Sequence, residues 1–206
     1  MTSTPRPRPE ARRERASGEG AGVLSLSAVD LTTEVVRTDR LTLRPYRPDD
    51  VDAVHRASQD PETQRWIGLL PLPYTREEAR KFVEDIAMKE REDGLGLSVV
   101  IEADGELVGT GGLHLRPGRL GPEIGYSVAP WARRRGYAAE AAHGLAAWAL
   151  GHGAPRVHLF ADVGNTASQA VAVRAGFTAE GTVRGCLEYR DGSRGDAVLF
   201  GRLAGE

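Results

Sequence analysis

The chain has 206 residues, of which 40% are hydrophobic and 27% are charged, a composition typical of globular proteins in water. Its formal net charge of -2 gives no general attraction to nucleic acid or to an anionic membrane. The single cysteine, Cys186, excludes an intrachain disulfide, and no apolar run is long enough to span a bilayer. The N-terminus lacks the apolar segment of a signal peptide. We therefore expect a cytoplasmic protein without nucleic-acid or membrane partners.

Residues 1–33 are rich in proline, arginine and glycine, and they carry too little apolar surface to offset the entropy cost of ordering. Two interpretations remain open, a basic arm that contacts RNA or the ribosome and a solvated extension, and the composition favours the extension. We predict a flexible tail at 1–33 followed by one folded domain at 34–206.

The folded part begins with alternating apolar residues in 35–46, the signal of a first strand pair. Residues 48–50, Pro-Asp-Asp, are typical of a helix start, and apolar residues follow on one face. A second helix is predicted from Thr75 to the glycines near 94–96, because Thr75 and Glu78 have the spacing of a capping box.

Alternation and turn residues predict three strands after these helices, at 97–101, 107–115 and 123–129. Asp104-Gly105 between the first two is suited to a tight hairpin turn. The next expected elements are a helix at 136–150 with one apolar stripe, a strand at 157–163, a short helix from Asn165 to Gly176, and strands near 177–190 and 196–203. This mixed order predicts an α/β fold whose sheet is not purely doubly wound.

Residues 123–141 carry the most chemical information. They comprise a strand, a proline break, three consecutive arginines and a helix that opens with Gly136. A helix N-terminus presents unpaired N–H groups and the positive end of its dipole, which suits a pyrophosphate. Gly136 and the small Ala138 leave the backbone open, and the arginines add positive charge. The alternatives are a solvated basic turn at 133–135 and ordinary helix residues at 137–138, and the strand-to-helix context favours phosphate binding.

The spacing Arg133-x-x-Gly136-x-Ala138 resembles the acyl-CoA loop, [Gln/Arg]-x-x-Gly-x-[Gly/Ala], of the GNAT N-acetyltransferases. The string from Gly125-Tyr126 to Ala141 looks like the branch that acetylates the N-termini of ribosomal proteins. The resemblance covers nearly all of 34–203, including residues 37–44, Val108-Gly109, Asn165-x-x-Ser168 and Gly176-Phe177. One departure is Arg134, which stands where many members have glycine, although its N–H can still bind phosphate if its side chain points outward.

The resemblance implies the GNAT fold, a mixed central sheet of about six to seven strands flanked by about four helices and splayed between the fourth and fifth strands. It implies acetyl-CoA as the acyl donor, with its pantetheine arm inserted between the strands at 123–128 and 157–163, and direct attack by an amine in a ternary complex. The N–H of Val128 is then expected to face the thioester oxygen. The coenzyme-binding residues implied are Val128, Arg133, Arg134, Arg135, Gly136, Tyr137, Ala138, Asn165 and Ser168.

Two residues are the catalytic candidates. Glu123 is the candidate general base, acting through a water, because alternation places it on the same face as Gly125 and Ser127; a plain surface glutamate is an equal alternative. Ser168 is the candidate general acid or hydrogen-bond donor to the coenzyme thiolate, and its alternative is support of the helix start at Asn165. Many relatives use a tyrosine four residues before the Gly-Phe pair, where this chain has Ala172, so that acid is absent here.

The acceptor side carries weaker signals. Residues 66–74 form an apolar, proline-punctuated loop, and in the family this region walls the acceptor pocket, so Trp66 and Leu70 are candidate substrate contacts; core packing is the alternative. His114, on a strand beside the expected site, is a third candidate, against a purely structural role. The five histidines have no ligand spacing with a carboxylate or the cysteine, so we expect no metal.

These features predict acetyl-CoA-dependent acetylation of a protein N-terminus or of a small-molecule amine, by a monomer or homodimer. Transfer of a larger acyl group, such as succinyl, and a non-catalytic acyl-CoA sensor remain as alternatives. The presence of both Glu123 and Ser168 argues against the sensor. A dinucleotide-binding fold is disfavoured because no Gly-x-Gly-x-x-Gly follows a first strand.

Overall fold

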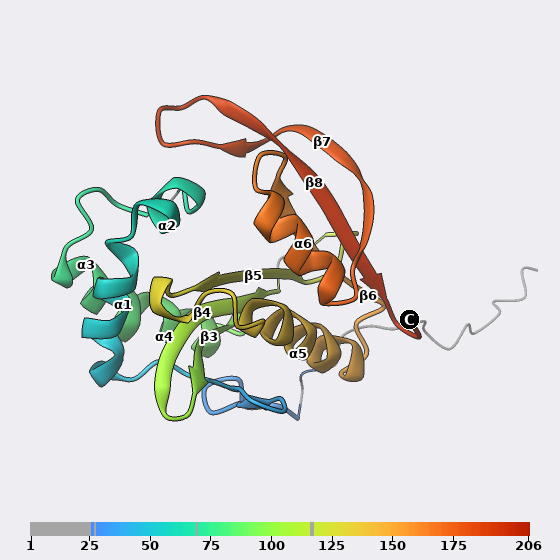
Figure 1. The fold of residues 1–206 in the computed structure, drawn as a ribbon. Helices are drawn as coiled ribbons and strands as arrows, with labels where there is room; N and C mark the ends of the chain where they lie inside the picture. The colour runs from blue at the N-terminus through green and yellow to red at the C-terminus, as the bar shows by residue number, and fades with distance from the viewer. Residues whose placement is uncertain (1–25, 27, 69, 116–117) are drawn as a thin grey trace, which may run out of the picture.

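The computed structural model describes residues 26, 28–68, 70–115 and 118–206, and they form one sheet with helices on both faces (Figure 1). The sheet order is β1-β2-β3-β4-β5-β6-β8-β7. Its strands are β1 (Val36–Arg37), β2 (Thr42–Arg44), β3 (Gly96–Ala103), β4 (Glu106–His114), β5 (Glu123–Val128), β6 (Arg156–Asp162), β7 (Thr178–Glu188) and β8 (Arg194–Leu203). The predicted mixed sheet is confirmed, because β5 and β6 are parallel and the other neighbours are antiparallel. Eight strands slightly exceed the predicted six to seven, since the short pair β1–β2 joins the same sheet.

The helices follow the predicted order with one addition. They are α1 (Val51–Ser58), α2 (Pro61–Trp66), α3 (Arg76–Lys81), α4 (Ala87–Glu92), α5 (Tyr137–Gly151) and α6 (Thr166–Arg174). A π-helical segment, Phe82–Ile86, joins α3 to α4, and together they form the single long helix predicted from Thr75. The Thr75 hydroxyl caps this helix by accepting a hydrogen bond from Glu78 N at 3.2 Å. The addition is α2, which begins with Asp60 as N-cap and Pro61 in its first turn.

Two apolar cores lie on opposite faces of the sheet. The central strand β3 supplies both, because Leu97, Val99 and Ile101 pack into the larger core under α5 and α6, while Val100 packs into the smaller core under α1, α3 and α4. Every residue of β3 from 96 to 101 is buried. Ser98 is the one polar residue between 96 and 101, so this stretch does not alternate between apolar and polar residues, as expected for a strand covered on both faces.

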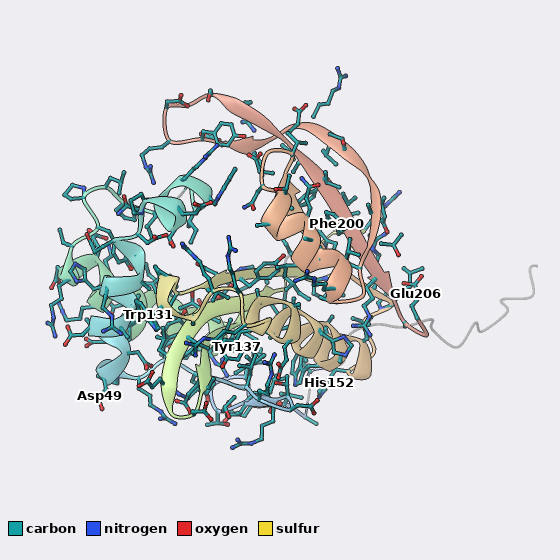
Figure 2. The ribbon with its side chains drawn as sticks, viewed as in Figure 1. Asp49, Trp131, Tyr137, His152, Phe200 and Glu206 are labelled. Atoms are coloured by element: carbon teal, nitrogen blue, oxygen red, sulfur yellow. The ribbon has the colours of Figure 1, made fainter. Side chains whose placement is uncertain are left out.

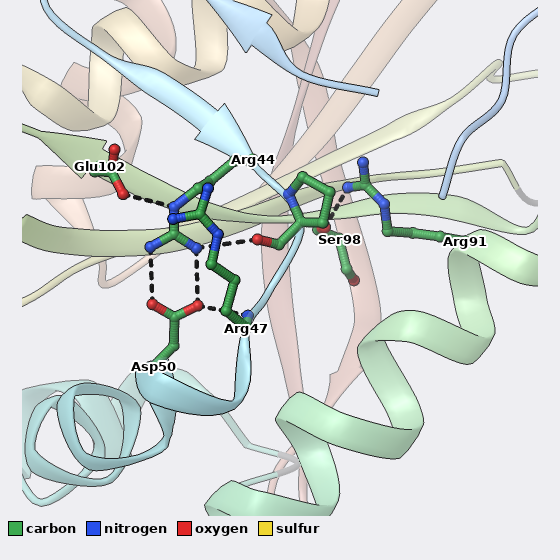
Figure 3. Close-up of polar contacts among 7 residues, drawn as sticks. Arg44, Arg47, Asp50, Arg91, Ser98 and Glu102 are labelled. Atoms are coloured by element: carbon green, nitrogen blue, oxygen red, sulfur yellow. Dashed lines mark hydrogen bonds and ion pairs between the residues drawn. The ribbon is translucent and has the colours of Figure 1, made fainter. Parts of the chain in front are cut away.

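Buried arginine networks anchor the edge of the sheet (Figure 3). Arg44 of β2 donates to both oxygens of Asp50 at 2.8 Å, and its Nε donates to Glu102 of β3 at 2.6 Å. Asp50 also accepts from Arg47 N at 2.7 Å. A bidentate, charge-assisted contact of this kind fixes orientation as well as adding energy, so β2, β3 and the start of α1 are held together.

Arg91 of α4 fixes the chain that leads into β1. Its guanidinium donates to three carbonyl oxygens, those of Leu31, Glu34 and Ser98, at 2.5 to 2.7 Å. Burial lowers the pKa of Arg91 to about 10. Leu31 is itself buried in the larger core, so packed structure reaches back to this residue. Residues 1–25 and 27 of the predicted tail lie outside the described part of the chain.

Candidate active site

The sheet opens between β5 and β6. Strand β5 pairs with β4 along its length, from Val128 opposite Gly109 to Glu123 opposite His114. With β6 the described residues pair only where Glu123 lies opposite His158, so the strands meet at their start and then diverge, as predicted. Ala129 N donates to Val108 O of β4 at 2.9 Å. Because N–H directions alternate along a strand, those of Tyr126 and Val128 point into the gap.

The loop after β5 delivers the chain to the N-terminus of α5. Gly136 is the N-cap, with φ +83°, a left-handed conformation that glycine adopts without strain. The first bond of the helix runs from Glu140 N to Gly136 O at 3.1 Å. The N–H groups of residues 137–139 therefore precede the helical ladder and are available to an anion. A Cβ built at Gly136 would meet Arg40 Nη2 at 3.4 Å, so the glycine leaves an open approach to these donors.

The three arginines of the loop have different surroundings. Arg133 pairs with Asp60 at 2.5 Å and donates to the Thr63 hydroxyl at 3.1 Å. Arg134 and Arg135 are exposed. Arg134 has φ +63°, so the departure from glycine is accommodated by a left-handed arginine whose side chain is solvated. We call Gly136 and the N–H groups of residues 137–139 the cradle. Positive charge beside the cradle comes from Arg134 and Arg135, because the guanidinium of Arg133 is held by Asp60 at the start of α2.

Asp60 links this loop to α2. Its carboxylate accepts from Thr63 N at 2.8 Å as the N-cap of α2 and also binds Arg133. Burial alone would raise the pKa of Asp60, but the hydrogen bonds from Arg133 and Thr63 hold it below its usual value. The ionised carboxylate therefore ties the loop after β5 to the start of α2.

A second brace joins the opposite side of the loop to the first strands. Glu140, in the first turn of α5, accepts from Thr38 Oγ1 at 2.6 Å and from Arg40 N at 2.8 Å. Arg40 also binds its carboxylate at 2.5 Å and donates to Arg135 O at 3.0 Å. Burial opposes ionisation of Glu140, but these bonds lower its pKa. Arg40 therefore neutralises the negative charge of Glu140 beside the cradle. Spacing and periodicity in the sequence did not predict the pairing of Arg40 with Glu140.

Two aromatic residues, Trp131 and Tyr137, lie at the ends of the loop (Figure 2). Trp131 donates from its indole to Leu107 O at 3.2 Å and lies under the Arg56 guanidinium, 4.0 Å from the ring centre. Tyr137 is 9% exposed, packs in the larger core and lies under the Arg40 guanidinium, 5.0 Å from the ring centre, so its side chain is engaged in packing. Ala138, partly buried in the same turn, adds little bulk.

Ser168 and Asn165 lie at the start of α6, beside the gap. Asn165 Oδ1 accepts from Ser168 N at 3.0 Å, which confirms the predicted N-cap. The hydroxyl of Tyr126, on β5, lies 3.1 Å from Ser168 Oγ and 3.1 Å from Ser168 O. Burial raises the pKa of Tyr126. Tyr126 was not among the predicted site residues, although it lies inside the most informative stretch of the sequence.

Glu123 lies at the closed end of the gap. Its Oε2 is 4.0 Å from His158 Nε2, and burial lowers the pKa of His158, which favours a neutral imidazole there. The other sheet neighbour, His114, binds Glu90 of α4 at 2.6 Å. Along the strand, Glu123 stands about 16 Å from Val128, at roughly 3.3 Å per residue. Glu123 and His114 are therefore remote from the open end, where Ser168 and Val128 lie.

Two cavities flank the open end. A small one of about 80 Å³ lies between α1, the π-helical segment, the middle of β4 and the end of β5, where Thr110, Ser127 and Tyr74 contribute to its wall. A larger one of about 460 Å³ lies between α2, the end of β6 and the β7–β8 turn. Its wall includes Trp66, a predicted substrate contact, and Asp162. A cavity of this size is within the usual range for small ligands or a peptide end.

The β7–β8 hairpin extends toward α2 (Figure 1), and residues of its turn line the larger cavity. At its turn, Arg190 donates to Leu70 O at 2.9 Å and to Gln64 O at 3.4 Å. Tyr189 donates to Asp162 Oδ2. Leu70, the other predicted contact in the 66–74 loop, packs its side chain against the smaller core, so this residue presents its carbonyl to the hairpin. Together these contacts roof the larger cavity.

The described residues contain no group of three or more His, Cys, Asp or Glu side chains that could hold a metal ion. No described helix is long and apolar enough to cross a membrane. The single cysteine, Cys186, is exposed on β7.

Comparison with known proteins identifies this arrangement. Residues 40–178 match the family described as acetyltransferase (GNAT) domain. An uncharacterized N-acetyltransferase of Bacillus subtilis, YoaA, is 26% identical over 168 residues, which cover 81% of this chain and 94% of the relative. The structure of Mycobacterium smegmatis RimJ in complex with a CoA-disulfide is 26% identical, with a TM-score of 0.72, covering 83% of this chain and 88% of that one. RimL, a ribosomal L7/L12 alpha-N-protein acetyltransferase solved with coenzyme A, is 25% identical, with a TM-score of 0.71 and coverages of 82% and 98%.

Proposed function

Because this chain belongs to the GNAT acetyltransferase family, we propose that it transfers an acetyl group from acetyl-CoA to a primary amine in a ternary complex. The observation that carries the proposal is the gap between β5 and β6, whose open end lies beside the N-terminus of α5 and the hydroxyl of Ser168. The gap accepts an extended arm, the helix end accepts a pyrophosphate, and the hydroxyl meets the reacting end. We place the reaction in the cytoplasm, where acyl-CoA is available.

The cradle fits the coenzyme's phosphates. The N–H groups of residues 137–139 and the open surface of Gly136 bind the pyrophosphate, and the exposed Arg134 and Arg135 add positive charge. Arg133 contributes through its backbone, because its guanidinium is held by Asp60. Asn165 and Ser168 border the pantetheine arm from the α6 side.

Acetyl-CoA, when bound, supplies the thioester electrophile. Val128 N–H, directed into the gap, donates to the thioester oxygen where negative charge develops, and a donor of this kind lowers the activation barrier by about 3 kcal/mol. Ser168 lies on the other side of the gap and hydrogen-bonds the departing sulfur. The small cavity of about 80 Å³ beside Ser127 supports an acetyl rather than a succinyl donor, since a longer acyl chain with a terminal carboxylate finds little space there.

Glu123 serves as the general base through intervening water. Its distance along the strand from Val128, about 16 Å at the usual rise per residue, requires more than one water between its carboxylate and the amine. Its neighbour His158 holds a buried ring whose lowered pKa favours the neutral form. Proton removal by this route is slower than by a base in direct contact, so the contribution of Glu123 is expected at the low end for general-base catalysis, about 10²-fold or less.

The acceptor enters through the larger cavity. Trp66 and Asp162 form part of its wall, and the β7–β8 turn covers it. The volume of about 460 Å³ and the acceptor named for RimL favour the N-terminal amine of a protein or peptide over a small amine.

A coenzyme-release assay tests this function. Purified protein is mixed with acetyl-CoA or succinyl-CoA and with peptides whose N-terminal amine is free, and free thiol is measured. The same peptides with a blocked N-terminus are the matched controls. We expect thiol release with acetyl-CoA and the free N-termini only. Release that is equal with the blocked peptides would contradict the N-terminal assignment, and tight acetyl-CoA binding with no release from any amine would favour a sensor.

A further inference from the structure

One side chain bridges the two arms of the gap. Tyr126 projects from β5 on the face that carries the larger core, because Ile124 and Val128, two residues to either side, pack into the same core. Its hydroxyl reaches Ser168 in the first turn of α6, the helix that follows β6. Ser168 is thus held from two sides, at its N–H by Asn165 and at its hydroxyl by Tyr126.

The contact leaves a choice for the hydroxyl proton of Tyr126. Two acceptors, Ser168 O and Ser168 Oγ, are both at 3.1 Å, and a phenol has one proton to donate. If the proton goes to the carbonyl, Ser168 donates back to Tyr126. If it goes to Oγ, the proton of Ser168 is free to point into the gap. A tyrosine of ordinary pKa, about 10, already keeps its proton at neutral pH, and burial raises the pKa of Tyr126 further, so the phenol remains a donor.

We propose that Tyr126 is a positioning residue, which donates to Ser168 Oγ and so aims the serine hydroxyl at the coenzyme sulfur. This inference rests on the proposed function and concerns its leaving-group step. The new C–N bond forms, the C–S bond breaks, and its electron pair goes to sulfur. Ser168 donates a hydrogen bond to that thiolate and keeps its proton, since an ordinary thiol has a pKa near 8.5 and an aliphatic hydroxyl is far less acidic. The sulfur later takes up the proton that the amine has lost.

The test measures the ionisation of the coenzyme thiol on the protein, without an acceptor. CoA is bound to the wild type and to Tyr126→Phe, Ser168→Ala and the double variant, and thiolate absorbance in the ultraviolet is followed as pH is raised. The complex with desulfo-CoA, which lacks the sulfur, supplies the tyrosine background. Calorimetry of CoA binding and thermal unfolding accompany each titration. Tyr46→Phe is the matched control, because Tyr46 is also buried, in the smaller core, and its hydroxyl hydrogen-bonds the side chain of Thr110.

The wild type is expected to bind CoA with its thiol more acidic than in free CoA. Each single variant should lower the thiol ionisation constant by about tenfold, as for loss of a hydrogen bond to a charged group. The double variant should match Ser168→Ala, because Tyr126 acts through the serine, and Tyr46→Phe should equal the wild type.

A bound thiol with the wild-type pKa in Tyr126→Phe, at unchanged CoA affinity, would overturn the inference and leave the proposed function standing. Failure of the wild type to bind CoA would overturn both. If Tyr126→Phe proves unfolded, Ser168→Thr, which keeps a hydroxyl, is compared with Ser168→Ala, and equal thiol pKa values in the two would remove Ser168 and Tyr126 from this step.

Discussion

Gly136 is where the coenzyme cradle is most sensitive to a single added group. Its φ of +83° strains any residue with a Cβ by about 1 to 2 kcal/mol, although aspartate tolerates this conformation better than alanine. The added Cβ meets only the end of the flexible Arg40 side chain, at 3.4 Å, so steric cost adds little. We therefore expect Gly136→Ala to lower the free energy of unfolding by about 1 kcal/mol and Gly136→Asp by less.

Coenzyme binding should rank the two variants the other way. The methyl group of alanine intrudes between the phosphates and the N–H groups of residues 137–139, while aspartate adds a negative charge at the same place. At this exposed loop salt screens the repulsion, so we expect an additional loss of about 1 to 2 kcal/mol, or roughly 5- to 30-fold in affinity, for aspartate.

Calorimetry of CoA binding and urea unfolding of both variants measure the two rankings. Gly105→Asp is the matched control, because Gly105 has a similar φ of +80°, nothing lies within 4 Å of its added Cβ, and it belongs to the β3–β4 turn. It should be destabilised without losing CoA affinity. Wild-type CoA affinity in a folded Gly136→Asp protein, or weaker binding by Gly136→Ala than by Gly136→Asp, would refute the assignment of this helix end to the phosphates.

Three further outcomes are expected. Glu123→Gln should lower kcat by about 10²-fold or less, the low end for general-base catalysis, with CoA affinity unchanged by calorimetry. Full activity would remove Glu123 from the mechanism. Asp60→Asn should lower the melting temperature at neutral pH. Because the pKa of Asp60 is lowered in the folded protein, the carboxylate stabilises the fold above its unfolded-state pKa, and this stabilisation is lost as the pH falls through its folded-state pKa. A melting-temperature difference from wild type that persists below both pKa values would contradict this. Asp50→Asn should lower the free energy of unfolding in urea by about 3 kcal/mol, because Arg44 stays buried with one fewer charged partner. Asp52→Asn breaks an exposed ion pair with Arg76 and should unfold like the wild type. An equal loss of unfolding free energy in the two variants would contradict the importance of burial.

Local signals predicted the elements that depend on neighbouring residues. Thr75 and Asn165 cap the helices expected of them, and Asp104-Gly105 forms the β3–β4 turn with positive φ at both residues. These features are readable because each is satisfied within four residues of its own position. The helix α2 was missed although Asp60-Pro61 is a good start signal, because at six residues it is too short to show helical periodicity.

Contacts between distant segments were not predictable from spacing or periodicity. Arg133 and Asp60 are 73 positions apart, Arg40 and Glu140 are 100 apart, and only the folded sheet brings either pair together. Strand alternation predicted the face on which the Glu123 side chain lies, but alternation does not give the distance of that side chain from the open end of the gap. Tyr126 was not predicted as a site residue, because its partner Ser168 lies on another element, 42 positions away in the chain.

Acetylation of a peptide with a free N-terminus, followed by mass spectrometry, tests the central claim most directly. Wild-type protein with acetyl-CoA should add one acetyl group to the N-terminal amine, Gly136→Asp should do so far more slowly at low coenzyme concentration, and Gly105→Asp should match the wild type. A peptide that stays unmodified while the protein binds acetyl-CoA, or that gains the group equally with Gly136→Asp, would contradict the account.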